Sequence, residues 1–495
     1  MAVTAAVGAG LAFAAPAQAA VVIDTEDLRA AVTVDGVRAH QSALQSIADN
    51  NGGTRQAGTA GHEASVDYMQ ALLDDAGYAT WTQEFEYERA TLVGSTFEQI
   101  SPVAAPYLYG ADYLEMEGSG DATATVTGVD LVVGDPASST SGCEASDFAG
   151  FPAGDIALIQ RGTCSFESKV LNATAAGASG VIIFNQGNGD GRTGLFAGTL
   201  GDTFADIPVI SAPFDLGTTL AATEDLVVHL EVDLQIDTVV TENLLADSPT
   251  GRTDRTVVVG GHLDSVGEGP GINDNGSGTA AILETALQIA ALDIPLENRV
   301  RFAFWSGEED GLLGSSYYVS QLSKSEIKGT ALNLNFDMVG SPNAVNFVYD
   351  GDGSAFGTKG PVGSALIEGV FTDFFDSEDA PTAPSGFDGR SDYLGFIEAG
   401  IPAGGLFTGA EGLKTAAEAE LFGGTAGVAY DPCYHQACDT FDNVSLETLD
   451  IMSDAIAHAT LTFAETTSAV NGTAKGKGLG HNKTEAEFRG SSAVR

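Results

Sequence analysis

The second half of the chain alternates apolar runs with helical stretches, and this alternation constrains the fold more than any other feature. After Thr238, the apolar run Val257–Val259 leads through a Gly-rich turn into an almost wholly apolar helical stretch near residues 278–291. The runs Val300–Trp305 and Leu332–Phe336 follow, with another helical stretch between them. Continuous apolar strands that alternate with helices are typical of a parallel sheet covered on both faces. We therefore predict an α/β fold with a mixed, mostly parallel sheet flanked by helices.

The first half of the chain changes its periodicity twice. Residues 24–88 have a helical and then an extended pattern, with a helical stripe at Val66, Met69, Leu72 and Leu73. From about residue 92 to 236, short β-rich runs alternate with Gly, Ser and Asp turns, and helical signal is sparse. This region is expected to be an inserted, β-rich domain.

These changes of pattern divide the chain into five parts. The length of 495 residues is enough for two to four domains at about 150 residues each. The predicted parts are a signal peptide at 1–19, the first part of the main domain at 24–94, the inserted domain at 95–236, the second part of the main domain at 237–466 and a tail at 467–495.

The acidic composition excludes some partners. The chain has 68 Asp and Glu against 21 Lys and Arg, which gives a formal net charge of −47. Such a surface repels the phosphates of nucleic acids and anionic membranes, so we expect neither as a partner. The simplest interpretation of the acidity is a solvated surface.

Both ends of the chain resemble processing or linker segments. Residues 1–23 carry no charge, and Ala17-Gln18-Ala19 follows an apolar stretch as an A-x-A cleavage site, which predicts secretion. A membrane anchor is the alternative, but Pro16 breaks the run and the run is only weakly hydrophobic. The last 25 residues carry five basic residues against two acidic ones and no apolar period, which predicts a flexible tail or a processed propeptide.

Export makes the four cysteines interpretable as disulfides. Cys143 and Cys164 lie in one Gly-rich region, while Cys433 and Cys438 lie five residues apart. Two local bridges are the simplest of the three pairings. A Cys-ligated metal site is the alternative, but the chain has no C-x-x-C pair.

Chemistry-bearing side chains follow each of the three predicted strands and recur near the end of the chain. In chain order they are His262, Asp264, Asp274, Glu308, Glu309, Asp337 and His435. Ligands of open α/β sheets bind at the carboxyl ends of the strands, so we expect these side chains to converge. Imidazoles and carboxylates without thiolates suit Zn²⁺ with an open coordination position. A metal would also offset the repulsion among converging carboxylates.

The number of ligands favours two metals, about 3.5–4 Å apart and bridged by one carboxylate. Asp274, directly before a helix, is the natural bridge between them. His262 with Asp337 would complete one metal, and Glu309 with His435 the other. Asp264 would then orient His262 from behind, and Glu308 would face the metal-bound water as general base.

The sequence around these residues resembles the M28 family of zinc aminopeptidases, especially its secreted bacterial members. The matching runs are GGHLDSVGEGPGINDNGSG, FAFWSGEEDGLLGS, NFDMVG, GRSDY with GIPAGGLFTG, and AYDPCYHQACD. The resemblance implies the same ligands, namely His262, Asp274, Glu309, Asp337 and His435, and the same base, Glu308. It also implies two zinc ions per chain.

The resemblance adds roles for residues that the pattern alone leaves open. It implies that Tyr434 donates to the oxyanion of the tetrahedral intermediate and that the Cys433–Cys438 bridge holds Tyr434 and His435 in position. The free α-ammonium of the substrate would lie near Glu308, Asp337 and the backbone of Arg390. Met338 and Phe407 would line an apolar pocket with Tyr434, so Leu, Met or Phe is expected at the N-terminus of the substrate.

The inserted region resembles a protease-associated (PA) domain, through the run RGTCSFESKVLNATAAGASGVIIFN. Some relatives bind calcium, and Asp450 with Asp454 resemble part of that site. The matching N-terminal position, however, is Ala31. Tyr393 in GRSDY stands where some close relatives have His.

We therefore expect a secreted, monomeric, di-zinc aminopeptidase that acts on peptides with a free N-terminus. Two alternatives remain open. A metallocarboxypeptidase or deacylase of the same fold would accept substrates with a blocked N-terminus. A non-enzymatic binding protein with this domain pairing would be expected to lose metal ligands, and here all five are present.

Overall fold

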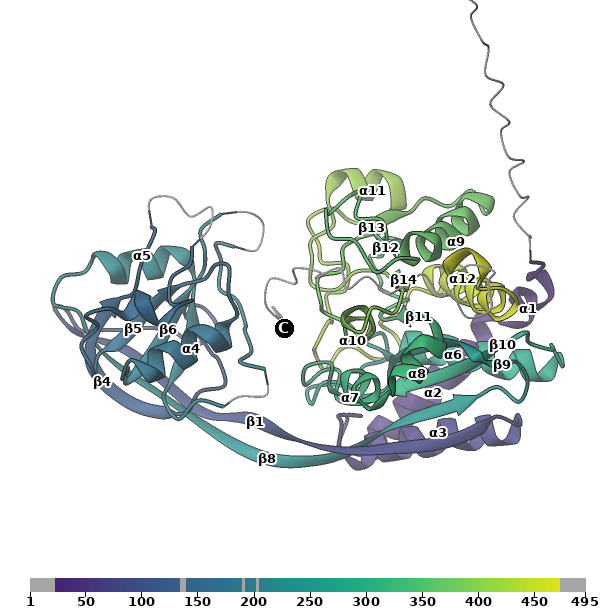
Figure 1. The fold of residues 1–495 in the computed structure, drawn as a ribbon, viewed down its shortest axis with the longest axis horizontal. Helices are drawn as coiled ribbons and strands as arrows, with labels where there is room; N and C mark the ends of the chain where they lie inside the picture. Colours follow the sequence, from purple (N-terminus) through teal and green to yellow (C-terminus); the bar gives the residue numbers. More distant parts are fainter. Residues whose placement is uncertain (1–22, 134–138, 189–191, 202–203, 472–495) are drawn as a thin grey trace, which may run out of the picture.

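The computed structural model describes residues 23–471, apart from 134–138, 189–191 and 202–203. The predicted signal peptide at 1–19 and most of the predicted tail at 467–495 lie outside the described residues. Two bodies are visible, and the strands β1 (Ala79–Ser101) and β8 (Val227–Asp247) run between them as a long two-stranded ribbon (Figure 1). The larger body carries the predicted metal ligands, and the smaller one is the inserted domain.

The sheet of the larger body has a parallel centre with antiparallel edges. Its strand order is β13-β12-β14-β11-β9-β10-β8, and β14, β11, β9 and β10 pair in parallel. The strands are β8 Val227–Asp247, β9 Arg252–His262, β10 Asn298–Trp305, β11 Thr330–Phe336, β12 Phe347–Tyr349, β13 Ala383–Ser385 and β14 Ala403–Phe407. The predicted mixed, mostly parallel sheet is confirmed.

Helices cover both faces of this sheet, as the apolar strands require. One core contains Val257, Val259 and Phe302, which pack beneath α6 (Gly276–Ala291) and α12 (Leu446–Glu465). Alternate residues of the same strands point to the other face, where Trp305 packs against residues of α7 (Leu313–Gln321) and α10 (Leu394–Glu398). Trp305 is fully buried.

Several helices of the larger body begin at a side-chain cap. The helices of this body are α1 Glu26–Ala31, α2 Val34–Asn50, α3 Ala60–Asp75, α6 Gly276–Ala291, α7 Leu313–Gln321, α8 Lys324–Gly329, α9 Ser364–Ser377, α10 Leu394–Glu398, α11 Ala416–Phe422, α12 Leu446–Glu465 and α13 Ser468–Asn471. Side-chain caps begin α2, α3, α6 and α12, for example. In α6, the Asn275 side chain accepts a hydrogen bond from the Gly278 N–H, which satisfies a free donor of the first turn. A Cβ at Gly278 would collide with Phe336 O, so glycine lets α6 lie directly on β11.

The inserted domain is rich in strands, as predicted, and it also contains two helices. Its strands are β2 Ala105–Pro106, β3 Leu114–Glu115, β4 Gly120–Gly128, β5 Ile156–Gln160, β6 Gly180–Phe184 and β7 Val209–Ala212, and its helices are α4 Phe166–Ala175 and α5 Phe214–Ala222. Strands β4, β5, β6 and β7 pair in parallel. The sparse helical signal misses α4 and α5, which are only 10 and 9 residues long.

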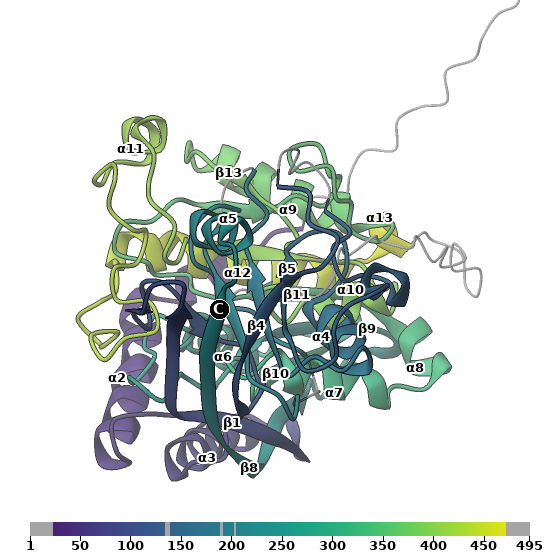
Figure 2. The ribbon, with the colours of Figure 1, turned by 90° about the vertical axis from the view of Figure 1, so that its left-hand side faces the viewer.

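The domain boundaries predicted at residues 95 and 236 fall inside strands. Strand β1 runs from Ala79 to Ser101 and pairs antiparallel with β8 throughout, including across both boundaries. Seen from the side of the inserted domain, β1, β8 and β4 run side by side in front of the larger body (Figure 2). Because β8 pairs with β10 in the larger body and with β4 in the inserted domain, one continuous sheet extends through both bodies.

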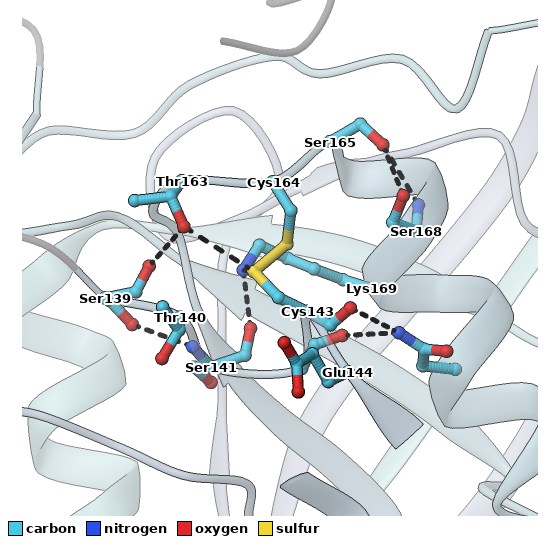
Figure 3. Close-up of a disulfide and its surroundings, with 12 residues drawn as sticks. Ser139, Thr140, Ser141, Cys143, Glu144, Thr163, Cys164, Ser165, Ser168 and Lys169 are labelled. Atoms are coloured by element: carbon cyan, nitrogen blue, oxygen red, sulfur yellow. Dashed lines mark hydrogen bonds between the residues drawn. A yellow bond between two sulfur atoms is a disulfide. The ribbon is translucent and has the colours of Figure 1, made fainter. Parts of the chain in front are cut away.

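The inserted domain contains the first disulfide, Cys143–Cys164, with a Cα–Cα distance of 5.7 Å. The buried side chain of Lys169 lies beneath it, and its Nζ donates to Ser141 O at 2.5 Å (Figure 3). Burial lowers the pKa of the Lys169 ammonium to about 8. The second bridge, Cys433–Cys438, lies in the larger body, so both local pairings favoured by the sequence are present.

Candidate active site

Five separate chain segments bring the predicted ligands to one edge of the sheet. His262 is the last residue of β9, Asp274 lies two residues before α6, and Asp337 directly follows β11. Glu308 and Glu309 follow β10, and His435 lies inside the loop closed by Cys433–Cys438. The convergence expected at the carboxyl ends of the strands is present.

The contacts divide the cluster into two halves that share Asp274. His262 Nε2 lies 3.2 Å from Asp337 Oδ1 and 3.2 Å from Asp274 Oδ1. His435 Nε2 lies 2.9 Å from Glu309 Oε2 and 3.4 Å from Asp274 Oδ2. The two oxygens of Asp274 therefore face one imidazole each, which is the arrangement that a bridging carboxylate needs.

Asp264 lies behind the cluster and faces the far nitrogen of His262. His262 Nδ1 lies 3.2 Å from the Asp264 backbone oxygen and 3.7 Å from its carboxylate. The carboxylate accepts hydrogen bonds from the backbone N–H groups of Glu308 and Glu309, at 3.3 and 3.4 Å. The fully buried Asp264 thus faces His262 and also fixes the turn that presents the two glutamates.

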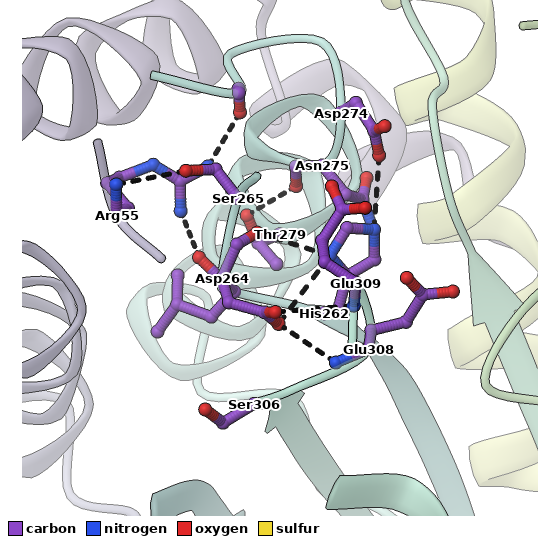
Figure 4. Close-up of polar contacts among 12 residues, drawn as sticks. Arg55, His262, Asp264, Ser265, Asp274, Asn275, Thr279, Ser306, Glu308 and Glu309 are labelled. Carbon is purple, nitrogen blue, oxygen red and sulfur yellow. Dashed lines mark hydrogen bonds and ion pairs between the residues drawn. The ribbon is translucent and has the colours of Figure 1, made fainter. Parts of the chain in front are cut away.

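A buried arginine that the sequence analysis missed fastens the loop between His262 and Asp274 (Figure 4). The guanidinium of Arg55 donates to Pro270 O at 2.8 Å, to Gly271 O at 2.6 Å and to Leu263 O. Burial lowers the pKa of Arg55 to about 10, against the raising effect of Asp264 and other nearby carboxylates. Its only sequence signal is a basic residue in an uncharged Gly/Thr loop of a chain poor in basic residues.

Asp439 holds the bridging residue through the main chain. Its two carboxylate oxygens accept from the backbone N–H groups of Asn273 and Asp274, at 2.8 and 2.9 Å. Burial raises the pKa of the Asp439 carboxyl to about 7. Because Asp439 directly follows Cys438, the disulfide loop that carries His435 also positions Asp274.

The pKa values of the clustered side chains are shifted by burial and by an excess of carboxylates over imidazoles. Burial raises the pKa of Glu309 to about 7, and Asp274 adds to the shift. Burial also raises the pKa of Glu308 well above its usual value, against the lowering effect of His262. Burial by itself would lower the pKa of His435, but Glu309 and Asp274 raise it to about 11.

This donor set fits divalent metal ions. Asp274, Glu308 and Asp337 are 5, 9 and 8% exposed, and the Glu309 side chain is 6% exposed. Among the residues that the structure describes, Glu309 Oε1 is buried without a hydrogen-bond partner. Imidazole nitrogens and carboxylate oxygens that converge in this way are ligands of borderline cations, and a cation would offset their mutual repulsion.

The pocket beside the cluster contains the residues predicted to bind the substrate. A cavity of about 100 Å³ is lined by Glu308, Met338, Arg390, Phe407 and Tyr434, among others. Arg390 forms an ion pair with Glu411 at 2.8 Å, and its Nη2 donates to Tyr434 Oη at 3.3 Å. The Tyr434 ring stacks on the His435 imidazole, with 3.8 Å between centroids.

The predicted calcium residues lie elsewhere, on α12. Asp454 faces a positive charge of the protein, because Arg29 Nη1 lies 3.9 Å from its carboxylate and 2.9 Å from that of Glu378. Burial raises the pKa of Asp454 to about 6. A guanidinium thus already provides a counter-charge at this position.

The fold and the site together define an α/β metallopeptidase with an inserted domain. Comparison with known families gives the same class: residues 243–460 match the model of peptidase family M28, and residues 126–220 match that of the PA domain. The chain belongs to the M28 family and is a metallo-aminopeptidase.

Named relatives of the chain are aminopeptidases. It is 50% identical over 432 residues to an aminopeptidase of Pseudomonas aeruginosa, covering 86% of this chain and 80% of that protein. It is 38% identical over 454 residues to leucine aminopeptidase 2 of Arthroderma otae, covering 89% and 86%. Among solved structures it is similar to the aminopeptidase of Aneurinibacillus sp. strain AM-1, with 26% identity, coverage of 88% and 95%, and a TM-score of 0.69.

Proposed function

We propose that the protein is a secreted di-zinc aminopeptidase that removes large apolar residues, of the leucine type, from the N-terminus of peptides. The observation that carries the proposal is the placement of Asp274 between His262 and His435. His262, Asp337 and Asp274 would hold one zinc ion, and His435, Glu309 and Asp274 the other. When bound, zinc supplies Lewis-acid polarisation of the scissile carbonyl and a water molecule that is acidic at neutral pH.

Glu308 is the residue available for proton transfer. Its carboxylate lines the pocket but is not needed to complete either half of the cluster, and Asp264 fixes its backbone. In our proposal it accepts a proton from the attacking water and then donates that proton to the leaving amine. The Glu308 carboxylate thus acts first as general base and then, once protonated, as general acid.

Tyr434 is placed to stabilise the developing oxyanion. Because Arg390 donates to the Tyr434 oxygen, the phenolic proton stays free to point at the substrate. The carboxylates of Glu308 and Asp337 at the pocket wall would receive the α-ammonium, which explains a requirement for a free N-terminus. Met338 and Phe407 provide apolar surface for the first side chain, and similarity to a leucine aminopeptidase supports this preference.

Export and a monomeric state complete the proposal. The two disulfides support an oxidising compartment, since such bridges are rare in the cytosol. None of the described helices is both long and apolar enough to cross a membrane. Determination of the mature N-terminus and of the mass in solution would test both points.

Three p-nitroanilide substrates test the reaction class. We expect hydrolysis of Leu-p-nitroanilide, a weaker reaction with Glu-p-nitroanilide, and no reaction with acetyl-Leu-p-nitroanilide. Hydrolysis of the acetylated substrate at a similar rate would instead indicate a deacylase or an endopeptidase.

A further inference from the structure

A second cavity lies between the larger body and the PA domain. Its volume is about 570 Å³. Residues of β1 between 85 and 92 form one side, and residues of the larger body between 310 and 320 form another. Residues 115–117, 197–199, 201 and 204 of the PA domain and Leu234 of β8 contribute the rest. Both bodies are therefore needed to form it.

This cavity lies directly beside the candidate active site. Gly311 and Leu312 line the active-site pocket, while Asp310 and Leu313 on either side of them line the second cavity. The four-residue segment 310–313 therefore lines both cavities. Since each extended residue spans up to about 3.5 Å, a peptide held by its first residue at Glu308 needs only a few more residues to enter the second cavity.

The lining of this interdomain cavity is aromatic and acidic. Phe85 stacks on Tyr317 with 5.2 Å between ring centroids. Among the described lining residues the acidic side chains are Glu86, Glu88, Glu115, Glu117 and Asp310, and the basic one is Arg89.

The positive charge of Arg89 is already compensated within the wall. Its guanidinium forms an ion pair with Asp310 at 2.6 Å and donates to Ala57 O at 2.8 Å. Glu115 accepts a hydrogen bond from the neutral Tyr109 hydroxyl, and Glu86 and Glu88 are exposed on β1. The cavity therefore presents a net negative surface beside apolar rings.

We infer that the interdomain cavity binds the part of the peptide substrate downstream of the scissile bond, and that it favours downstream segments with Lys or Arg. The inference rests on the proposed aminopeptidase function. Glu86 and Glu88 would attract the cationic groups, whereas the rings of Phe85 and Tyr87, which alternate with them along β1, would offer apolar surface in another part of the cavity. The PA domain would thereby act in substrate selection.

Three substrates separate this inference from the proposed function. Leu-p-nitroanilide has no downstream residues, whereas Leu-Gly-Gly-Lys-Lys-Gly and Leu-Gly-Gly-Glu-Glu-Gly differ only beyond the third residue. We expect the wild-type kcat/KM of the Lys peptide to exceed that of the Glu peptide about tenfold at low salt, through KM. Added salt should reduce the difference, because these charges are exposed.

A variant of β1 in which two glutamates become lysines tests whether the cavity causes the preference for the Lys peptide. We expect Glu86→Lys/Glu88→Lys to lower kcat/KM of the Lys peptide about fivefold to tenfold and to leave Leu-p-nitroanilide hydrolysis unchanged. Glu84→Lys is the matched control, because Glu84 lies on the same face of β1 but does not line the cavity. This control should leave all three substrates unaffected.

The outcomes are distinct. Failure of the wild-type protein to cleave Leu-p-nitroanilide would overturn the proposed function. Cleavage of the anilide with equal use of the two hexapeptides would overturn the inference about the cavity alone. An equal effect of Glu84→Lys would also overturn it, because the preference would then come from the overall charge of the protein.

Discussion

Two groups of carboxylates lie on opposite sides of the segment Asp310–Leu313, and they differ in burial. The sheet-edge cluster, namely Asp274, Glu308, Glu309 and Asp337, is almost completely buried. The cavity carboxylates Glu86 and Glu88 are exposed on the ribbon. In the first group each unbalanced charge is costly, whereas water screens the charges of the second.

We infer from this difference in burial that Asp and Glu side chains serve two purposes in this protein. Buried carboxylates require metal ions, oriented imidazoles and a fixed backbone, so a single substitution should have a large effect. Exposed carboxylates act through a screened field, so several must change before binding responds. Variants in the two groups should therefore differ in the size of their effect.

Replacement of the proposed base should have the largest effect. Glu308→Gln keeps the shape of the side chain but removes its ability to accept a proton, so we expect kcat to fall about 10²–10⁴-fold. Zinc content and thermal stability should be retained. Glu284→Gln is a suitable control, since Glu284 is also buried but contacts His40 outside the pocket. Wild-type turnover by Glu308→Gln would contradict its assigned role.

Removal of the buried arginine should weaken the site indirectly. Arg55→Met leaves three carbonyl oxygens of the loop without their donor, and each unpaired group costs about 1–3 kcal/mol. We expect a lower melting temperature, about tenfold lower kcat and weaker zinc retention during dialysis. The partly exposed Arg38→Met serves for comparison. If Arg55→Met loses stability but keeps full zinc affinity and kcat, Arg55 only supports the fold.

The two disulfides offer a smaller and more selective test. Cys433→Ser/Cys438→Ser removes a short loop constraint, worth about 2 kcal/mol in the chain-entropy model, and should lower kcat severalfold by loosening His435 and Tyr434. Cys143→Ser/Cys164→Ser should cost about 3 kcal/mol in the PA domain but leave hydrolysis of Leu-p-nitroanilide intact. Equal effects on kcat would show that the first bridge does not position the site.

The sequence allowed prediction of the parallel sheet and of the residues that converge at its edge. Continuous apolar strands such as Val300–Trp305 imply burial on both faces, and the ends of parallel strands meet at one edge. The two local disulfides followed from spacing and export. These predictions depend on local patterns, which a single sequence displays.

Long-range features were not predictable in the same way. Arg55 lies more than 200 residues from the carbonyls that it binds, so no spacing reveals the contact. The boundaries at 95 and 236 missed the ribbon because β1 and β8 have the same β pattern inside and outside the PA domain. The interdomain cavity depends on the folded arrangement of segments far apart in the chain, which no motif encodes.

The central claim is that the buried sheet-edge cluster holds two zinc ions that share Asp274. Metal-free protein, titrated with zinc while bound metal and Leu-p-nitroanilide hydrolysis are followed, tests this claim most directly. We predict that about two zinc ions per chain bind at saturation and restore full activity, and that Asp274→Asn loses tight binding of both. Full activity at one zinc ion per chain, or unchanged zinc binding by Asp274→Asn, would contradict the account.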